Sequence, residues 1–526
     1  MITFILMRKP DHYLFATQID WDIIIIGGGA TGLGIAVDAA NRGLRTLLVE
    51  QADFAKGTSS RSTKLVHGGV RYLAQGDIGL VRHALRERGL LAKNAAHLVH
   101  KEEFIIPCYS WWSILIYGIG LTLYDWLAGK LSFGKSRYRP KKEITALMPG
   151  IKSKGLKGGI SYFDGKFDDA RLAINLMQTA QEQGALLINY MQVTQLLKND
   201  DTVCGVEVKD LLSGGHYNFG AKCVINATGI FVDDILKLNN PNTPQMVRPS
   251  QGVHIVLKKE FLNSSYALMI PKTSDKRVLF AVPWHEHLLV GTTDTPIEEH
   301  SLEPRALQQE IDFILNNASA YFESKPSTHD ILSVFSGLRP LAAPAKAGKN
   351  STKEISRDHK LVVSAKGLLT ITGGKWTTYR KMAEDTVSLA INEMGLAPRP
   401  CATQHLPIHG NSQTTGNDYL DTYGTDRKHI EALCLQKPEL LAPLHPNFPY
   451  IVAEVIWAVR SEMALTVEDV LSRRLRVLFI DAKAAIEMST MVASLMATEL
   501  SLDQKWEADQ IEKFNKLANG YVYQGK

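Results

Sequence analysis

The most constraining feature of this sequence is a strand, glycine turn, helix and second strand within its first fifty residues. Residues 22–26 read DIIII, a β-branched run typical of a strand buried on both faces of a parallel sheet. The segment 27–34 reads GGGATGLG, and a helix over 35–41 and a buried strand over 45–49 follow it, ending at Glu50. This order predicts a dinucleotide-binding α/β unit, in which a pyrophosphate lies at the helix N-terminus and Glu50 binds a ribose hydroxyl.

Two later segments discriminate between the dinucleotides that such a unit can bind. VINATG at 224–229 and LLTITGG at 368–374 are each predicted to be a buried strand followed by a tight turn. After the second, a helix is predicted to begin near Thr377. A helix N-terminus there would stabilise negative charge on a reduced flavin by a few tenths to about 2 kcal/mol. NAD has no use for that late site, so the pattern favours FAD.

The sequence also carries longer motifs that resemble those of one enzyme family. They are GTSSRSTKLVHGGVRYL at 57–73, CVINATG at 223–229, GTTDTP at 291–296, SGLRPL at 336–341 and TGGKWTTYRKMAEDT at 372–386. From about residue 20 to its C-terminus the chain resembles FAD-dependent glycerol-3-phosphate dehydrogenase of the respiratory, mitochondrial type. The resemblance implies non-covalent FAD, oxidation of sn-glycerol 3-phosphate to dihydroxyacetone phosphate by hydride transfer to the flavin, and electron transfer to membrane quinone.

The fold that the resemblance implies is α/β. It has a Rossmann-like FAD-binding domain of the D-amino-acid-oxidase-like type, an inserted antiparallel-sheet cap or substrate domain, and a C-terminal helical domain. Strand-like runs such as GVHIVL and RVLFAV within 231–335 independently predict an antiparallel sheet. The predicted boundaries are 20–105, 155–230 and 336–394 for FAD binding, 106–154 and 231–335 for the cap, 395–417 for a linker rich in Pro, Gly, Ser and Thr, and 418–526 for the helical domain.

Cofactor contacts are expected along the glycine turn, the hydroxyl-rich loop and the two later turns. Small hydroxyl residues can donate hydrogen bonds to phosphate and flavin oxygens while the chain passes close to the cofactor. The predicted cofactor-binding residues are Gly27, Gly28, Gly29, Gly32, Glu50, Thr58, Ser59, Ser60, Lys64, His67, Gly229, Gly374 and Thr377.

The substrate site must hold a phosphate dianion and remove a hydroxyl proton. Fixed cations, best supplied as arginine forks, suit the phosphate, and a base or a cation that lowers the alcohol's pKa suits the hydroxyl. The resemblance implies that His254 lies near the reacting carbon and that the substrate is surrounded by Arg71, Tyr72, Arg339, Arg357 and Lys375. The proton acceptor stays open between His254 and Lys375, with Arg339 assisting at the alkoxide.

Other classes of function fit the sequence less well. The net charge of +5 suits an anionic substrate or membrane surface but is too small to indicate nucleic acid. Five cysteines without a CxxC favour a reducing compartment over a disulfide framework or zinc site. The WHEH segment at 284–287 lacks a third ligand, so no metal is expected. A glycerol-3-phosphate oxidase that uses oxygen and an amine or amino-acid oxidase remain the alternatives, and the oligomeric state, a homodimer included, stays open.

A membrane-contacting helix is predicted within the cap. Residues 111–124 read WWSILIYGIGLTLY, too short to cross a bilayer but with aromatic residues that suit its interface. Basic residues that suit anionic headgroups follow, namely Lys130, Lys135, Arg137, Arg139, Lys141 and Lys142. A helix that dips into the membrane would give access to quinone, and a buried cap helix is the alternative. The expected location is peripheral, on the cytoplasmic face of the cell membrane, or on the mitochondrial inner membrane in a eukaryote.

Overall fold

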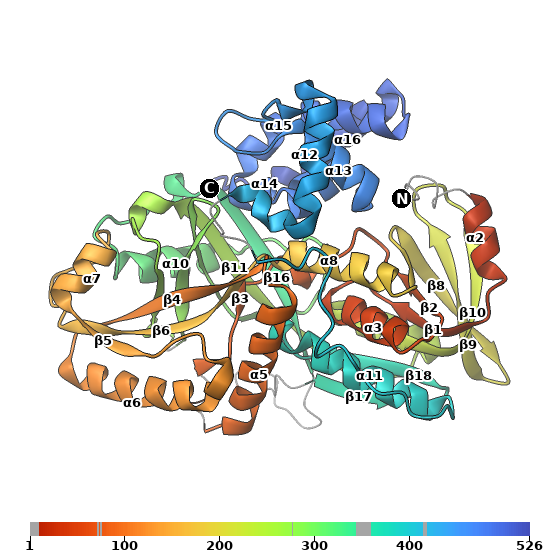
Figure 1. Ribbon diagram of the computed structural model, residues 1–526, viewed down its shortest axis with the longest axis horizontal. Helices are drawn as coiled ribbons and strands as arrows, with labels where there is room; N and C mark the ends of the chain where they lie inside the picture. Colours follow the sequence, from red (N-terminus) through yellow and green to blue (C-terminus); the bar gives the residue numbers. More distant parts are fainter. Residues whose placement is uncertain are drawn as a thin grey trace.

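The computed structural model describes residues 10–70, 73, 76–275, 277–342, 359–413 and 418–525. These residues form two β-sheets, with a helical domain from the C-terminal part of the chain above both sheets in the view of Figure 1. The predicted residues Arg71, Tyr72 and Arg357 lie outside the described residues.

The first sheet carries the predicted dinucleotide-binding unit. Its order is β17-β18-β10-β1-β2-β7, in which β18, β10, β1, β2 and β7 run parallel, and β8 and β9 extend β10. The strands predicted at 22–26 and 45–49 are confirmed. The bounds are β1 Trp21–Ile26, β2 Thr46–Val49, β7 Leu186–Ile188, β8 Met191–Asn199, β9 Thr202–Asp210, β10 His216–Asn226, β17 His359–Val363 and β18 Leu368–Gly373.

Glycines let the helix after β1 approach its neighbours closely. α3 (Ala30–Asn41) packs against α8 (Asp169–Glu182) and α11 (Tyr379–Glu393). A Cβ at Gly32 would lie 1.9 Å from the carbonyl oxygen of Gly27, and one at Gly34 would lie 2.8 Å from the ring of Tyr379. The helix predicted over 35–41 is confirmed, but it begins earlier, at Ala30. Gly32 and Gly34 belong to its first turns, where the close packing leaves no room for a side chain.

The second sheet is antiparallel except where β12 pairs with β4, among the pairings of the described residues. Its order is β15-β11-β14-β13-β12-β4-β6-β3, with β16 on β11 and β5 on β6. The bounds are β3 Leu65–Val66, β4 Val99–Cys108, β5 Arg137–Pro140, β6 Gly158–Phe167, β11 Val247–Lys258, β12 Ala267–Ile270, β13 Leu279–Trp284, β14 His287–Gly291, β15 Thr295–Pro296 and β16 Ser333–Ala342.

The antiparallel sheet predicted for 231–335 is confirmed, but it draws on more of the chain than the sequence indicated. β6 lies within 155–230, and most of β16 lies within 336–394, ranges that were assigned to FAD binding. Both strands pair within the second sheet instead, because hydrogen-bond partners far away in sequence decide which sheet a strand joins.

The C-terminal part of the chain is helical, as predicted. The described linker residues 395–413 contain no helix or strand. The helices that follow are α12 Arg427–Gln436, α13 Val452–Ser461, α14 Val477–Ile480, α15 Ala482–Leu500 and α16 Gln504–Ala518, with a π-helix, η9, over Asp469–Arg474. Other helices among the described residues are α2 Pro10–Thr17, α5 Ile78–Asn94, α7 Lys141–Leu147, α9 Val232–Asn239 and α10 Gln308–Ser319.

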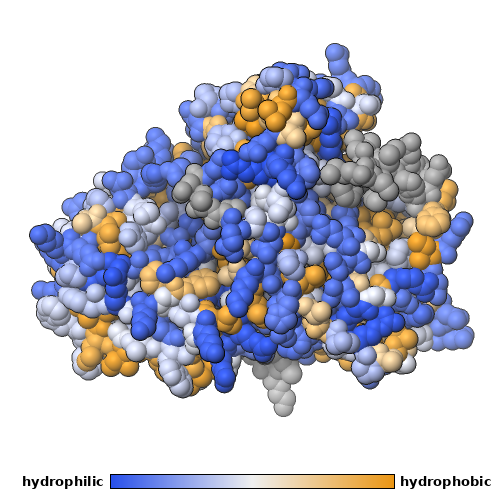
Figure 2. Space-filling model, in the orientation of Figure 1, coloured by the Kyte–Doolittle hydropathy of each residue, from blue (hydrophilic) through white to orange (hydrophobic). Residues whose placement is uncertain are grey.

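The predicted interfacial helix is α6 (Trp111–Ala128), which packs against β4, β5 and β6 of the second sheet (Figure 1). Its exposed residues include Trp111, Trp112, Leu115, Ile116, Ile119, Leu123 and Trp126, and only Leu121 and Tyr124 are buried. In Figure 2, apolar residues gather at the lower left edge, in the region of α6. The alternative of a buried cap helix is therefore wrong. No helix among the described residues is long and apolar enough to span a bilayer.

Candidate functional site

A cavity of about 760 Å³ lies where the two sheets meet, within the size range of cofactor and ligand sites. Its lining includes the carboxyl ends of β1, β2 and β18, and the loops that follow them. In open α/β sheets, ligands bind at this end of the parallel strands.

The turn after β1 forms a cradle for an anion at the N-terminus of α3. Gly27 has φ +108°, and a Cβ there would lie 2.8 Å from the carbonyl oxygen of Ala227. Gly29 precedes the first helical residue and lines the cavity with Ala30. The amide of Ala30 donates to Oγ of Ser59 over 2.9 Å, so the hydroxyl loop contacts the helix N-terminus directly. Backbone N–H groups at such an end bind pyrophosphate.

Glu50 lies at the end of β2 and lines the same cavity. Its carboxylate accepts hydrogen bonds from the amides of Gly28, at 2.6 Å, and Ala52, at 2.9 Å. Burial raises the pKa of this carboxyl above its usual value, and the two amides oppose that shift. The carboxylate is thus fixed beside the glycine turn, where a ribose would lie.

A second turn approaches the cavity after β18. Gly373 and Gly374 have φ of +80° and +83°, and the 3₁₀-helix η6 (Trp376–Thr378) leads into α11. The Oγ1 of Thr377 accepts from the amide of His67 at 3.2 Å, and Nε1 of Trp376 donates to the carbonyl of Ser59 at 2.8 Å. The two predicted cofactor segments are therefore linked to each other. Thr58 and Gly229, which has φ +61°, line the cavity as well.

His254 lies on β11 and lines the cavity, with its ring stacked on Phe335. Its Nε2 lies 2.9 Å from Oγ1 of Thr63. Burial, followed by the positive charges of Lys64 and Arg339, lowers the pKa of His254 well below 6.5. A neutral imidazole can accept a proton, which a charged one cannot.

Arg339 lies on β16 opposite β11, and its Nη2 is 3.1 Å from Oγ1 of Thr292. Its Nη1 lies 3.7 Å from the carboxylate of Asp294, whose other oxygen lies 3.9 Å from Nη1 of Arg277. The hydroxyl of Ser250 also donates to Asp294. All of these except Ser250 line the cavity, as does Lys375.

The sequence did not single out Arg277 or Asp294. Asp294 lies in the GTTDTP motif, but its pairing with Arg339 of β16 and with Arg277, which precedes β13, has no signal in the local sequence. The basic side chains that line this cavity include His254, Arg277, Arg339 and Lys375.

Several predicted residues lie away from the cavity wall. The amine of Lys64 is buried and ion-paired with Asp169 at 2.7 Å, and it also donates to the carbonyl of Ser60. Ser60 is buried, and its hydroxyl has no hydrogen-bond partner in the described structure. Gly28 and Gly32 act through packing, since a Cβ on Gly28 would lie 2.7 Å from the ring of Phe54.

The WHEH segment forms a tight turn between β13 and β14. His285 and Glu286 have φ of +45° and +59°, and their side chains contact different partners, Asp168 and Lys259. No group of side chains that could hold a metal ion occurs in the part of the chain that the structure describes.

Two family models match the chain. The first, described as FAD dependent oxidoreductase, covers residues 22–380, and the second, described as the C-terminal domain of alpha-glycerophosphate oxidase, covers residues 368–507.

Proteins similar over nearly the whole chain include two mitochondrial glycerol-3-phosphate dehydrogenases. One from Arabidopsis thaliana is 39% identical, with 94% of this chain and 85% of the relative covered. One from Homo sapiens is 38% identical, with 95% and 73% covered. A crystal structure of the glycerol-3-phosphate dehydrogenase from Bacillus halodurans, complexed with FAD, has a TM-score of 0.81 and 28% identity over the full length of both chains.

The glycine cradle, the fixed Glu50 carboxylate and the second turn beside His67 fit FAD. Together with the family model over residues 22–380 and relatives that match 94–95% of the chain, they lead to one assignment. The chain belongs to the FAD-dependent glycerol-3-phosphate dehydrogenase family.

Proposed function

We propose that this chain oxidises sn-glycerol 3-phosphate to dihydroxyacetone phosphate. The observation that carries the proposal is that the basic side chains of Arg277, Arg339 and Lys375 line the same cavity as His254 and the FAD cradle. A substrate that carries a phosphate dianion needs fixed cations, and an amino-acid substrate with one carboxylate would need fewer. When FAD is bound, the acceptor of the hydride from C2 is its flavin ring.

The arginines are proposed to bind the phosphate, or to assist at the alkoxide. Arg339 is held between Thr292 and Asp294, so its guanidinium enters the cavity in a fixed orientation. By the family resemblance, Arg71, Tyr72 and Arg357 complete the substrate site.

The hydroxyl proton needs an acceptor as C2 loses its hydrogen with the bonding electron pair. His254 is neutral near pH 7, because burial and two neighbouring cations lower its pKa, and it can therefore take the proton. Lys375 is the alternative acceptor. In either case the C2–O bond becomes a carbonyl. The hydroxyl proton moves to the side chain of His254 or Lys375, and the hydrogen of C2 leaves as hydride.

The decisive experiment is an anaerobic absorption spectrum of the purified holoenzyme with and without glycerol 3-phosphate. We expect the oxidised-flavin band to bleach with this substrate and to persist with glycine derivatives. Bleaching by glycine derivatives, but not by glycerol 3-phosphate, would instead identify an amine or amino-acid oxidase.

We further propose that α6 docks the protein on an anionic membrane, where it reduces quinone. Phe104, Tyr162 and Met269 line the cavity and pack in one apolar cluster with Leu121 and Tyr117 of α6. The exposed tryptophans of α6 suit the lipid interface. Of the basic residues that follow, Lys130, Lys135, Arg137, Lys141 and Lys142 are exposed, whereas Arg139 is buried against Glu103 and Glu143 and is removed from the predicted set.

The proposed location is therefore peripheral, on the cytoplasmic face of the cell membrane or on the mitochondrial inner membrane. One observation favours a second acceptor, oxygen, because the model that matches residues 368–507 is described from an alpha-glycerophosphate oxidase. Hydrogen peroxide formed per substrate oxidised separates the two. We expect little peroxide and rapid reduction of a quinone analogue, and stoichiometric peroxide would identify an oxidase.

A further inference from the structure

The segment between β2 and β3 forms much of the cavity wall. Within it, we name residues 50–61 the cofactor loop. Glu50, Gln51, Ala55, Lys56, Gly57, Thr58, Ser59 and Arg61 all line the cavity. Its only regular element is the 3₁₀-helix η1 (Thr58–Ser60), so contacts from outside the loop must fix its conformation.

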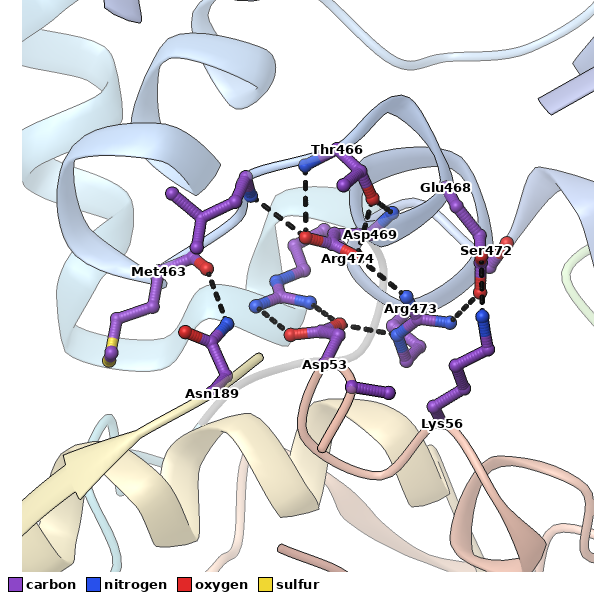
Figure 3. A network of polar contacts seen from close by, with 12 residues as sticks. Asp53, Lys56, Asn189, Met463, Thr466, Glu468, Asp469, Ser472, Arg473 and Arg474 are labelled. Atoms are coloured by element: carbon purple, nitrogen blue, oxygen red, sulfur yellow. Dashed lines mark hydrogen bonds and ion pairs between the residues drawn. The ribbon is translucent and has the colours of Figure 1, made fainter. Parts of the chain in front are cut away.

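The C-terminal helical domain supplies such contacts at the centre of the loop. Asp53 is fully buried, and its carboxylate pairs with both Arg473 and Arg474 of η9. Figure 3 shows Asp53 between these two guanidinium groups. The Nη2 of Arg474 lies 3.1 Å from the second carboxylate oxygen, so both oxygens are engaged. Such a forked pairing fixes orientation as well as distance.

The charges around this contact balance. Lys56 donates to Glu468 at 2.8 Å, and Arg473 also contacts Glu468 at 2.9 Å and Asp469 at 2.8 Å (Figure 3). Three cations and three carboxylates thus form one network across the boundary between the loop and the C-terminal domain. A buried network of this kind holds its members in place only while every charge is paired.

The loop transmits this contact to the glycine cradle. The amide of Ala55 donates to the carbonyl of Gly28 at 3.0 Å, and the amide of Ala52 donates to Glu50. At the other end of the loop, Arg476 donates to the carbonyl of Ser60 at 3.0 Å. A shift of Asp53 would therefore also move Ala52 and Ala55, whose amides contact Glu50 and Gly28 beside the glycine cradle.

We propose that Asp53, Arg473 and Arg474 are positioning residues for FAD, through which the C-terminal domain holds the cofactor loop in its binding conformation. Because coupling between two sites is reciprocal, bound FAD also stabilises the docking of η9 on the loop. This proposal requires FAD but no particular substrate, so it stands or falls independently of the reaction proposed above.

The first test uses Asp53→Asn in the holoenzyme. The variant keeps the shape of the side chain but removes its charge. We expect the FAD dissociation constant, measured by the recovery of free-flavin fluorescence on dilution, to rise roughly tenfold or more. The far-UV circular dichroism should stay that of the wild type.

The matched control is Glu462→Gln. Glu462 is equally buried at the same domain boundary, but its carboxylate pairs with Arg171 of α8 at 2.6 Å, and neither residue lines the cavity. Arg474 donates to the backbone carbonyl of Glu462, which the substitution leaves in place. We expect this variant to lower the melting temperature while leaving the FAD dissociation constant within twofold. Equal effects of both variants on FAD affinity, or no effect of Asp53→Asn, would overturn the proposal.

A second measurement needs no variant and covers the case in which Asp53→Asn fails to fold. Hydrogen exchange of the wild-type protein is compared with excess FAD and after FAD depletion. We expect amides of 469–476 to lose protection on depletion, while those of α15 and α16 stay protected. Unchanged protection of 469–476 contradicts the coupling.

Discussion

The Nε2 of His254 lies 2.9 Å from Oγ1 of Thr63, and the Nδ1 of the same ring is buried without a hydrogen-bond partner among the described residues. Thr63 belongs to the segment that follows the cofactor loop, whereas His254 belongs to the second sheet. One hydrogen bond therefore joins the cofactor side of the cavity to the proposed proton acceptor.

We expect His254→Gln to lower kcat/KM for glycerol 3-phosphate by about 10²- to 10⁴-fold, the usual contribution of a positioned base. FAD content should stay unchanged. Steady-state kinetics with a quinone analogue measures the effect. Thr63→Val, which removes only the orienting hydrogen bond, should cost less. A His254→Gln enzyme within twofold of the wild type would move the role of base to Lys375.

Arg339→Ala should remove about 2–5 kcal/mol of transition-state stabilisation, read from kcat/KM, because it leaves an anionic group without its cation. Asp294→Asn should raise KM more than it lowers kcat, because it loosens the orientation of Arg339.

Gly252→Ala tests the same guanidinium without changing any charge. A Cβ at Gly252 would lie 2.3 Å from Nη2 of Arg339 and would displace it. We expect the kinetics of this variant to follow those of Arg339→Ala. At Gly118 a Cβ would meet nothing closer than 3.8 Å, so Gly118→Ala is the control and should behave as wild type.

The linker contact at His409 should make stability fall at alkaline pH. Its ring lies 2.8 Å from Asp426 and 2.5 Å from Glu182. Burial opposes the charged ring, but the two carboxylates outweigh burial and raise the pKa of His409 from 6.5 to about 9. Because the folded state binds the proton more tightly, the contribution is complete below pH 6.5 and is lost as the pH rises through 9.

We expect this group to contribute about 2–3 kcal/mol to the free energy of unfolding at pH 6 relative to pH 9. Urea unfolding of the wild type and of His409→Gln at both pH values measures it. The difference between the two proteins should shrink towards alkaline pH, and a constant difference would contradict the assignment.

Trp111→Ala combined with Trp112→Ala should reduce flotation with anionic liposomes. Both side chains are exposed, and burying each in lipid contributes about 1.5–3 kcal/mol. The control is Leu435→Ala with Leu441→Ala, which removes exposed apolar residues from the C-terminal domain instead. Unchanged flotation of the tryptophan variant, or equal losses in both, would exclude docking through α6.

Local patterns predicted the parts of the fold that depend on neighbours in sequence. The apolar run at 22–26 predicted β1, and the spacing of the glycines predicted the turn after it. The second apolar run, which ends at Glu50, predicted β2. The start of α3 was placed too late, because Gly32 and Gly34 are poor helix formers and only their close packing explains their presence in the helix.

Long-range charge pairing could not be predicted in the same way. Lys64 was expected to bind the cofactor because of its motif, yet its amine pairs with Asp169, 105 residues away. Arg139 was assigned to lipid headgroups, but it pairs with Glu103 on β4. Asp294 was missed because its partners, Arg339 of β16 and Arg277 in the loop before β13, come from other segments of the chain. In each case the partner is set by the folded chain.

The pairing of Asp53 with Arg474 joins residues 421 positions apart. During synthesis at ~5–20 residues per second, the ribosome needs roughly 20 to 85 s to reach Arg474 after Asp53. Throughout that interval the nascent chain has its glycine turn but lacks the partners of Asp53. Completion of the flavin cleft in the cell must therefore wait until η9 has been synthesised.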